Sequence, residues 1–427
     1  MTYYPARATI DLGAIRTNVA ALRERTAADM MAVVKADGYG HGLVPVARNA
    51  VAAGANWLGT AHITEALQLR RAGLTCRILV WLYTPGSSLE QCVNADIDLS
   101  VSALWALEEV VAGARTAGRP ARIHLKVDTG MGRSGVTEQE YPELLAAALR
   151  AQEVGDVSVV GLWSHLACAD DPDHRANSEQ LAAFQRAVAL AEDQGAALEV
   201  RHLANSAATL LSPEYHFDLV RPGLAIYGLT PAPKHGSAAD FGLRPAMTLS
   251  ADLALVKDVP AGQGVSYDLM YTTERATRLG VVPLGYGDGI PRHASNRAQV
   301  LAGSAASPAD VPGEDAAAEV ARAEAAPGER RRVPLAGRVC MDQFVIDLGS
   351  PQDAAAGAAS SGGGPAGEPQ AAGPSASELR AGDEVVLFGP GDHGEPTAQD
   401  WAEAAETISY EIVTRLGPRI PRVYQNG

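Results

Sequence analysis

The sequence predicts an α/β protein that consists of a (β/α)8 barrel and a second, mainly β C-terminal domain. Two observations support this fold class. Up to about residue 245, short β-rich apolar runs alternate with stretches whose apolar residues recur every three or four positions, as they do on amphipathic helices. From residue 246, strand-like runs bounded by Gly, Pro and Asp replace that alternation. With 427 residues, the chain can bury two hydrophobic cores.

Eight apolar runs in the first part of the chain predict strands. They are residues 31–35, 56–61, 77–83, 96–101, 121–128, 158–166, 198–205 and 219–228. Strands separated by helices favour a parallel sheet, and eight is the number that closes a barrel of this type. On pattern alone, an open doubly wound sheet remains an alternative.

The domain boundaries follow from the same patterns. We expect residues 1–11 to form a strand that joins the β domain, residues 12–245 to form the barrel, and residues 246–427 to form the β domain. Residues 302–330 and 351–377 are rich in Ala, Gly, Pro, Ser and Glu and contain almost no large apolar residues. Such segments bury too little surface to offset their ordering entropy, so we predict mobile loops there.

The composition argues against several classes of function. A net charge of −15 disfavours nucleic acid and anionic membranes as partners. No apolar run approaches the ~20 residues that cross a bilayer, and the first residues lack the pattern of a secretory signal, so we expect a cytoplasmic protein. Cys76, Cys92, Cys168 and Cys340 form no CxxC pair, so we expect neither a metal site nor a disulfide framework.

Lysine is rare in this chain. Of 35 basic residues only four are lysine, which leaves 35 − 4 = 31 arginines. A primary amine can form a Schiff base, whereas a guanidinium cannot. Lys35 ends the first predicted strand, in AVVKADGYGHG, where a barrel places its catalytic groups. Lys234 and Lys257 lie in no motif, and we interpret them as surface residues.

Polar residues also follow two of the middle strands. Lys126 and Arg133 belong to HLKVDTGMGRSG, whose glycines let the backbone approach a ligand closely. His165 follows a strand in GLWSHLACADD, where an isolated histidine is more often structural than catalytic.

The last two strands end in a predicted phosphate site. Asn205 and Ser206 precede an apolar helical start, and a helix N-terminus with Ser suits both phosphate binding and simple capping. Arg221 and Gly223 lie at the eighth strand. Because the loops after strands seven and eight are the usual phosphate site of this barrel, the two motifs support each other.

Eight motifs, in order and spread over both domains, resemble those of the alanine racemases. They are VVKADGYGHG, KVDTGMGRSG, SHLACAD, ANSAA, VRPGLAIYG, PLGYGDG, GRVCMDQ and TISYEI. The two low-complexity segments have no counterpart in that family. The resemblance implies an enzyme that interconverts L-alanine and D-alanine with pyridoxal 5′-phosphate and supplies D-alanine for peptidoglycan. It also implies a head-to-tail homodimer in which each active site contains residues of both subunits.

The resemblance assigns roles residue by residue. Lys35 matches the lysine that holds the cofactor as a Schiff base, and Tyr267 matches the second base, which comes from the partner subunit. The other matches to cofactor-binding positions are Tyr39, His165, Asn205, Ser206, Arg221, Gly223, Leu224 and Tyr410, of which Arg221 faces the pyridine nitrogen. The matches to substrate-binding positions are Arg133, Lys126, Met341, Asp342 and Tyr286, and Lys126 matches a lysine that is often carbamylated.

These roles agree with the chemistry of racemisation. The α-proton must leave one face and return to the other, so two bases on opposite faces are needed. Lysine and tyrosine both titrate near ~10, so both must be tuned downward to act as bases near neutrality. An arginine does not readily give up its proton, so Arg221 would keep the pyridine nitrogen unprotonated and limit side reactions such as transamination.

Two residues depart from the family pattern, and three alternatives stay open. Asp268 stands where the family usually has glycine, and Gly287 replaces a common alanine. The alternatives are a broader amino-acid racemase, an amino-acid decarboxylase on the same scaffold, and a non-catalytic cofactor carrier. Tyr267 together with Arg221 favours racemisation over decarboxylation. A carrier would not need Tyr267 and Asp342.

Overall fold

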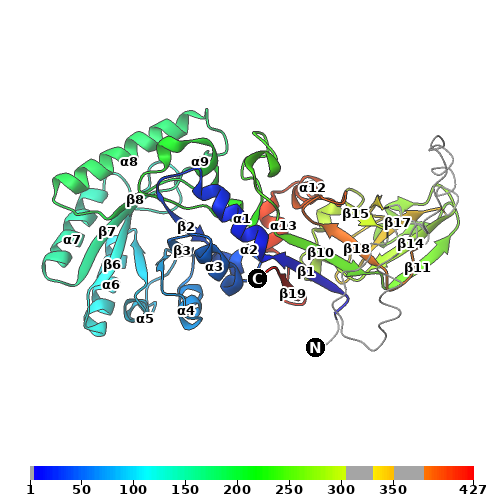
Figure 1. Ribbon diagram of the computed structural model, residues 1–427, viewed down its shortest axis with the longest axis horizontal. Helices are drawn as coiled ribbons and strands as arrows, with labels where there is room; N and C mark the ends of the chain where they lie inside the picture. Colours follow the sequence, from blue (N-terminus) through cyan, green and yellow to red (C-terminus); the bar gives the residue numbers. More distant parts are fainter. Residues whose placement is uncertain (1–3, 304–329, 351–378) are drawn as a thin grey trace. The chain divides into compact units, whose positions relative to one another are not determined.

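The chain folds into two units, each described here by itself. The computed structural model describes residues 4–303, 330–350 and 379–427. One unit comprises Asp11–Pro245 with residues 426–427, and the other Met1–Ile10 with Ala246–Gln425 (Figure 1). Apart from residues 302, 303 and 330, the predicted loops 302–330 and 351–377 lie outside the described residues. Within the described ranges, no helix combines the length and the apolar character needed to cross a membrane.

The first unit is a barrel of eight parallel strands. They are β2 (Asp29–Val33), β3 (Trp57–Thr60), β4 (Arg77–Val80), β5 (Asp98–Val101), β6 (Ala121–Lys126), β7 (Val157–Trp163), β8 (Val200–His202) and β9 (Leu219–Val220). From β2 to β8, each strand pairs with the next one in sequence, and β9 pairs with β2. Backbone bonds from Asp218 N to Arg201 O (3.1 Å) and from Arg221 N to Ala204 O (2.9 Å) connect the residues on either side of β9 to β8 and the segment after it. The barrel prediction is therefore confirmed, and the open sheet is excluded.

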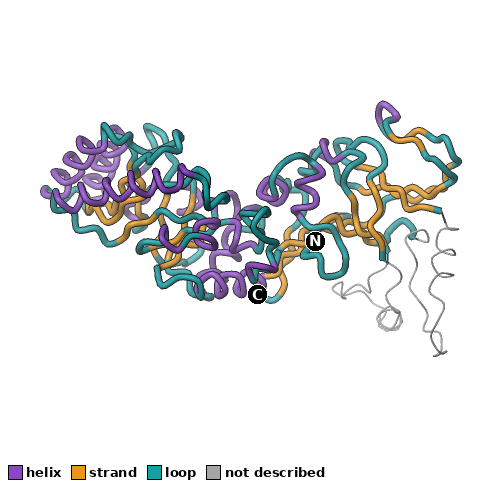
Figure 2. Tube along the Cα trace, turned by 90° about the horizontal axis from the view of Figure 1, so that it is seen from above, coloured by secondary structure: helices purple, strands orange, loops and turns teal. Residues whose placement is uncertain are grey.

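Helices connect the barrel strands. They are α1 (Leu12–Arg23), α2 (Lys35–Tyr39), α3 (Leu43–Ala52), α4 (Ile63–Arg71), α5 (Leu89–Asn94), α6 (Leu104–Ala117), α7 (Tyr141–Glu153), α8 (Arg175–Asp193) and α9 (Ser206–Leu211). In Figure 2 the longer of them flank the strands of this unit. Their apolar residues recur at the expected spacing: α6 buries Leu107, Val110 and Ala114 on one face.

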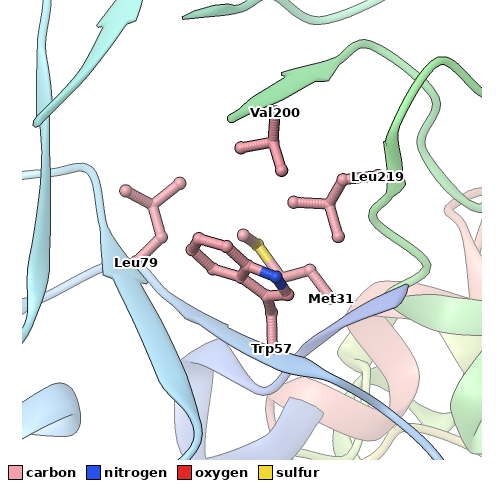
Figure 3. Packing of buried hydrophobic residues seen from close by; sticks show 5 residues of the cluster. All are labelled: Met31, Trp57, Leu79, Val200 and Leu219. Carbon is pink, nitrogen blue, oxygen red and sulfur yellow. The ribbon is translucent and has the colours of Figure 1, made fainter. Parts of the chain in front are cut away.

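Apolar side chains fill the barrel near the beginnings of its strands. Met31, Trp57, Leu79, Val200 and Leu219 come from five different strands and point toward one another (Figure 3). Trp57, Val200 and Leu219 are the first residues of their strands. These apolar groups fill part of the barrel interior, which also holds buried polar side chains.

The second unit is mainly β, as predicted. Its strands are β1 (Ala6–Asp11), β10 (Met247–Asp252), β11 (Leu255–Val259), β12 (Gly264–Val265), β13 (Tyr271–Thr272), β14 (Thr277–Val282), β15 (Gln299–Ala302), β16 (Arg331–Pro334), β17 (Phe344–Gly349), β18 (Glu384–Phe388) and β19 (Arg422–Gln425). They form sheets in the orders β16-β15-β18-β10-β1-β19, β11-β14-β17 and β12-β13. The N-terminal strand β1 pairs antiparallel with β10, with Ala8 opposite Leu249. Two short helices, α12 (Ala398–Ala404) and α13 (Ser409–Thr414), follow β18.

Candidate active site

Lys35 lies just beyond the strand that was predicted to contain it. Strand β2 ends at Val33, and Lys35 opens α2. The next four residues, 36–39, have φ values of 54°, 53°, 60° and 52°, so the chain makes a left-handed turn here. A left-handed conformation costs roughly 1–2 kcal/mol for each residue with a side chain, and local bonds must offset that cost. Glu65 Oε1 accepts from Ala36 N (2.7 Å), and Asp37 Oδ1 accepts from Leu43 N (2.8 Å).

The surroundings of Lys35 favour its neutral amine. Its Nζ lies 6.0 Å from the centroid of the Trp81 ring. Burial lowers the pKa of Lys35 below its ordinary value, and the nearby charge of Arg133 lowers it further, while Glu65 acts in the opposite direction. The unprotonated amine is the form that attacks a carbonyl carbon or removes a proton.

The turn after Lys35 meets the loops that follow β8 and β9. Ser206 Oγ accepts from Gly223 N (2.8 Å) and from Ala225 N (3.3 Å), so its own hydrogen can be donated elsewhere. A Cβ on Gly223 would lie well inside van der Waals contact of the Tyr39 hydroxyl oxygen and 3.0 Å from Tyr39 Cζ. Glycine is therefore needed where these loops pack.

Asn205 and Leu224 are the chain neighbours of Ser206 and Gly223. Asn205 is the N-cap of α9, and its Oδ1 accepts from Ala208 N (3.1 Å). Leu224 is buried and begins a 3-10 turn, Leu224–Tyr227, in the segment that was predicted to continue the last strand. Pro222 has no N–H to donate to the sheet, which explains why β9 ends at Val220.

Arg221 is buried and held from several sides. Its Nη2 donates to Ser164 O (2.7 Å) and Leu203 O (3.2 Å) and lies 3.2 Å from His165 Nδ1. Burial lowers the pKa of Arg221 to about 9, so the guanidinium remains charged at neutral pH. Burial and then the charge of Arg221 hold the pKa of His165 well below its ordinary value, so this histidine is neutral.

A directed chain of hydrogen bonds runs from Arg221 through the barrel interior. Arg221 Nη1 lies 3.2 Å from His202 Nδ1, His202 Nε2 lies 2.9 Å from His124 Nδ1, and His124 Nε2 lies 3.2 Å from Asp98 Oδ2. An arginine only donates, so His202 accepts at Nδ1 and donates from Nε2. His124 then does the same, and the chain ends on the Asp98 carboxylate.

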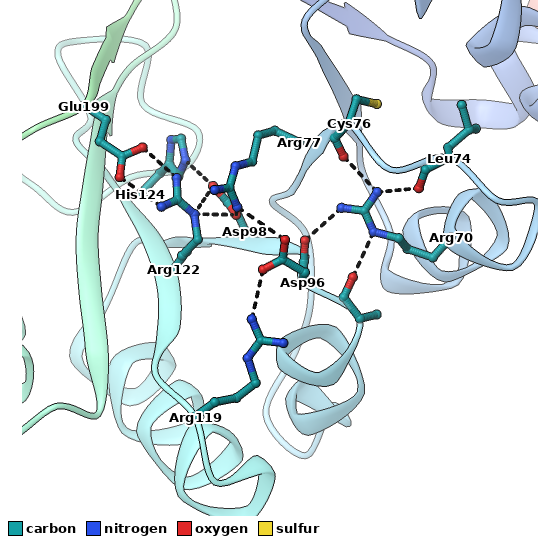
Figure 4. Close-up of polar contacts among 11 residues, drawn as sticks. Arg70, Leu74, Cys76, Arg77, Asp96, Asp98, Arg119, Arg122, His124 and Glu199 are labelled. Atoms are coloured by element: carbon teal, nitrogen blue, oxygen red, sulfur yellow. Dashed lines mark hydrogen bonds and ion pairs between the residues drawn. The ribbon is translucent and has the colours of Figure 1, made fainter.

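Both ends of this chain carry charge. Burial alone would raise the pKa of Asp98, but the hydrogen bond from His124 and the charge of Arg122 outweigh it and hold the pKa below its ordinary value. Arg122 Nε lies 3.1 Å from Asp98 Oδ1 (Figure 4). The sequence analysis missed Asp98, His124 and His202. The two-residue spacing of His124 and Lys126 on one strand was the available signal, because alternate residues share a face.

Lys126 and Arg133 add positive charge at the same mouth. Lys126 Nζ donates to Ser134 Oγ (2.6 Å) and lies 4.2 Å from the Trp163 ring centroid. Burial and then the charges of Arg221 and Arg133 lower the pKa of Lys126 to about 7. Arg133 is exposed on the loop after β6. The cations gathered here suit an anionic ligand.

The remaining predicted residues belong to the β unit. Tyr286 and Met341 lie on adjacent loops, because Tyr286 N donates to Cys340 O (2.9 Å) and Gly287 N to Met341 O (2.8 Å). Their side chains are exposed, as is that of Tyr267. Asp342 pairs with Arg419 at 2.8 Å. Tyr410 lies in α13, and its carbonyl oxygen accepts from the Thr414 hydroxyl (2.7 Å).

The departure at Asp268 has a local explanation. Asp268 has φ 62°, a conformation in which glycine is unstrained, and Arg338 Nε donates to its carboxylate at 2.6 Å. Ser266 Oγ also donates to Arg338 O (2.8 Å). The loop that carries Tyr267 is therefore attached on both sides of the tyrosine to the segment before Met341.

Comparisons with known proteins cover nearly the whole chain. Residues 10–231 match the model of the alanine racemase N-terminal domain, and residues 246–314 and 317–424 match that of the C-terminal domain. The chain is 54% identical over 425 residues to an alanine racemase of Beutenbergia cavernae, covering 99% of both chains. It is 54% identical to one of Streptomyces coelicolor, covering 99% of this chain and 96% of that one.

Solved structures give the same result. The crystal structure of alanine racemase from D-cycloserine-producing Streptomyces lavendulae has a TM-score of 0.85 at 51% identity, covering 100% of this chain and 98% of that one. The alanine racemase of Bacillus anthracis with bound L-Ala-P has a TM-score of 0.79 at 30% identity, covering 100% of this chain and 97% of that one.

Proposed function

The chain belongs to the alanine racemase family and is an isomerase acting on alanine, and we propose that it uses pyridoxal 5′-phosphate, with Lys35 and Tyr267 as its two bases. The relatives favour neither a decarboxylase nor a non-catalytic carrier. The observation that supports the proposal is that three features meet at one barrel mouth: a lysine amine whose pKa is lowered by burial, the contact of Ser206 and Tyr39 with Gly223, and a buried arginine.

The residues present fit that cofactor. Lys35 supplies an amine whose pKa is lowered by burial, as covalent attachment to an aldehyde requires. Ser206 and Tyr39 both lie close to Gly223, where a side chain would fill the remaining space. We assign the cofactor phosphate to this place. We assign Asn205, Leu224 and Tyr410 to the same end, Arg221 to the pyridine nitrogen, and His165 to the neighbourhood of the ring.

The protein's own residues then account for racemisation. When bound, pyridoxal phosphate withdraws electrons from the substrate's α-carbon and makes its proton acidic. Lys35 removes or returns that proton on one face, and Tyr267 does so on the other. Arg221 has a pKa of about 9, so it remains charged at neutral pH and donates without giving up its proton. This limits the electron withdrawal to what proton exchange needs.

Arg133 and Lys126 orient the substrate in this proposal. Arg133 binds the substrate carboxylate through charge and hydrogen bonds. Lys126 has a pKa of about 7, so much of its amine is neutral near physiological pH. A neutral amine is the form that adds carbon dioxide. We therefore propose that Lys126 is carbamylated, which would place an anion beside Arg133.

We propose that the working molecule is a homodimer with shared active sites. Tyr267, Tyr286 and Met341 are 69%, 42% and 56% exposed on the β unit. Tyr286 and Met341 lie on adjacent loops, and exposed large side chains that are grouped in this way are typical of an interaction surface. In the dimer, Tyr267, Tyr286, Met341 and Asp342 of one subunit complete the partner's barrel site. The free cysteines fit the reducing cytoplasm, where the product D-alanine would supply peptidoglycan synthesis.

The test is optical. Holoenzyme is incubated with L-alanine, and separately with D-alanine, and the circular dichroism is followed. We expect both signals to decay to zero at enzyme-dependent rates, and Lys35→Ala to abolish the decay. Full activity of Lys35→Ala would contradict the assignment of Lys35. A flat trace with intact cofactor absorbance would contradict the role of Tyr267 on alanine.

A further inference from the structure

Arg419 connects the two loops of the β unit that carry the proposed substrate-side residues. Its Nη1 donates to Asp342 Oδ1 at 2.8 Å, and its Nε lies 2.8 Å from Asp288 Oδ1. Asp342 directly follows Met341 on one loop. Asp288 belongs to the 3-10 turn Tyr286–Asp288 on the other. One guanidinium therefore links a side chain of each loop, in addition to the backbone hydrogen bonds between the loops.

Asp288 anchors Arg419. Its side chain is only 1% exposed, and a buried carboxylate needs partners for its oxygens. Oδ1 accepts from the Tyr4 hydroxyl (2.9 Å), and Oδ2 accepts from Gly285 N (3.0 Å). Asp342, by contrast, has a side chain that is 63% exposed. A guanidinium that is bonded to a buried carboxylate on one side thus also binds an exposed carboxylate on the other.

Gly287 leaves the space that Arg419 occupies. A Cβ on Gly287 would lie 2.6 Å from Arg419 Nη2 and 3.0 Å from Met341 O. Both distances are too short, so an alanine would displace the guanidinium or the loop. The glycine that replaces the family's common alanine is therefore matched to the position of Arg419 in this chain.

We propose that Arg419 is a positioning residue that holds Asp342 and cancels its charge on the substrate's path. Two carboxylates repel each other, most strongly where water is partly excluded. An unpaired Asp342 would therefore repel the substrate carboxylate before it reaches Arg133 of the partner subunit. This inference rests on the proposed function, in which Asp342 of one subunit faces the other subunit's site.

The experiment compares full-length holoenzymes in the racemisation assay. We expect Arg419→Ala to raise the KM for alanine on the order of fivefold, the effect of losing one partly exposed ion pair, with kcat changed less than about twofold. The double variant Arg419→Ala with Asp342→Asn should have a lower KM than Arg419→Ala alone, because asparagine needs no counter-charge. The Kd of propionate, which has the carboxylate but no amine, should follow the KM.

Two further variants keep the test decisive if Arg419→Ala folds poorly. Arg419→Lys keeps a positive charge near Asp288 but cannot donate from a rigid fork to both carboxylates, so the KM should still rise. Gly287→Ala should raise the KM, and its effect should be smaller in the Arg419→Ala background than in the parent. Additive effects of Gly287→Ala and Arg419→Ala, or a parental KM in Gly287→Ala, would overturn the inference.

The outcomes separate this inference from the proposed function. If Arg419→Ala has the parental KM, or if Asp342→Asn fails to rescue it, Arg419 is structural and the inference is wrong. Tyr267→Phe is measured in parallel. A loss of turnover in Tyr267→Phe with a parental KM in Arg419→Ala overturns the inference alone, whereas full turnover in Tyr267→Phe overturns the shared site as well.

Discussion

Replacement of Gly223 by alanine tests the proposed phosphate site most sharply. Gly223 has φ −112° and ψ −87°, outside the main regions that residues with a side chain adopt, so the change adds some backbone strain as well as volume. The new methyl group would lie inside contact of the Tyr39 hydroxyl and 3.0 Å from Tyr39 Cζ. Tyr39 cannot move aside easily, because it is 7% exposed and stacks on Tyr227 with centroids 4.7 Å apart.

The expected effect follows from overpacking. Extra volume in a packed site costs about 1–3 kcal/mol, so we expect Gly223→Ala to weaken cofactor binding roughly tenfold to a hundredfold. The assay is a titration of apoprotein with pyridoxal phosphate, followed by absorbance. As a control, Gly223→Ala is also measured together with Tyr39→Phe, because the phenylalanine lacks the oxygen that the new methyl group would meet. The reasoning is refuted if Gly223→Ala binds the cofactor normally, or if it costs as much with Tyr39→Phe as without it.

Three further predictions concern the buried chain, a lysine and the second base. Asp98→Ala should lower the free energy of unfolding by on the order of 3 kcal/mol in a denaturant titration, whereas Glu179→Ala, in an exposed ion pair, should cost less than about 1 kcal/mol. Equal losses would contradict the importance of the chain. The pKa of Lys126 falls from 10.5 to about 7 on folding, so in bicarbonate-free buffer the unfolded chain binds its proton more tightly between these values and stability should rise with pH across that window. The free energy of unfolding of the parent, measured relative to that of Lys126→Met, should therefore increase with pH over that range. A difference that stays constant with pH would argue against the lowered pKa of Lys126. Tyr267→Phe should reduce kcat/KM about a hundredfold to ten-thousandfold, and equally in both directions because the enantiomers have equal free energy. Tyr271→Phe, whose hydroxyl bonds Asp347, serves as its control and should stay active.

The barrel and many of the residues at the carboxyl ends of its strands could be predicted from the sequence. Strand periodicity predicts where each strand runs, and residues that follow parallel strands meet at one end of the barrel. Ser206 and Gly223, which are 17 positions apart, were predicted to meet on this basis, and the hydrogen bond between them bears this out. The left-handed turn after Lys35 was not predicted, because Ala36 and Asp37 do not favour positive φ by themselves.

Contacts between distant residues set the limit of sequence reasoning. His124 and His202 lie 78 positions apart, and only the closed barrel shows that they share a hydrogen bond. Likewise, no local pattern pairs Asp342 with Arg419, which lies 77 positions further along the chain. Asp268 and Gly287 looked like defects in the family pattern. Their explanation required the positions of arginines elsewhere in the fold.

The central claim is that each active site combines Lys35 of one subunit with Tyr267 of its partner. The most direct test is to co-express Lys35→Ala and Tyr267→Phe chains with different tags and to isolate the mixed dimers. Each mixed dimer would contain one site with both bases and one with neither, so the isolated mixed dimers should have about one half of the parental activity. Activity no higher than that of the two inactive parents would show that both bases come from the same subunit and would contradict the account.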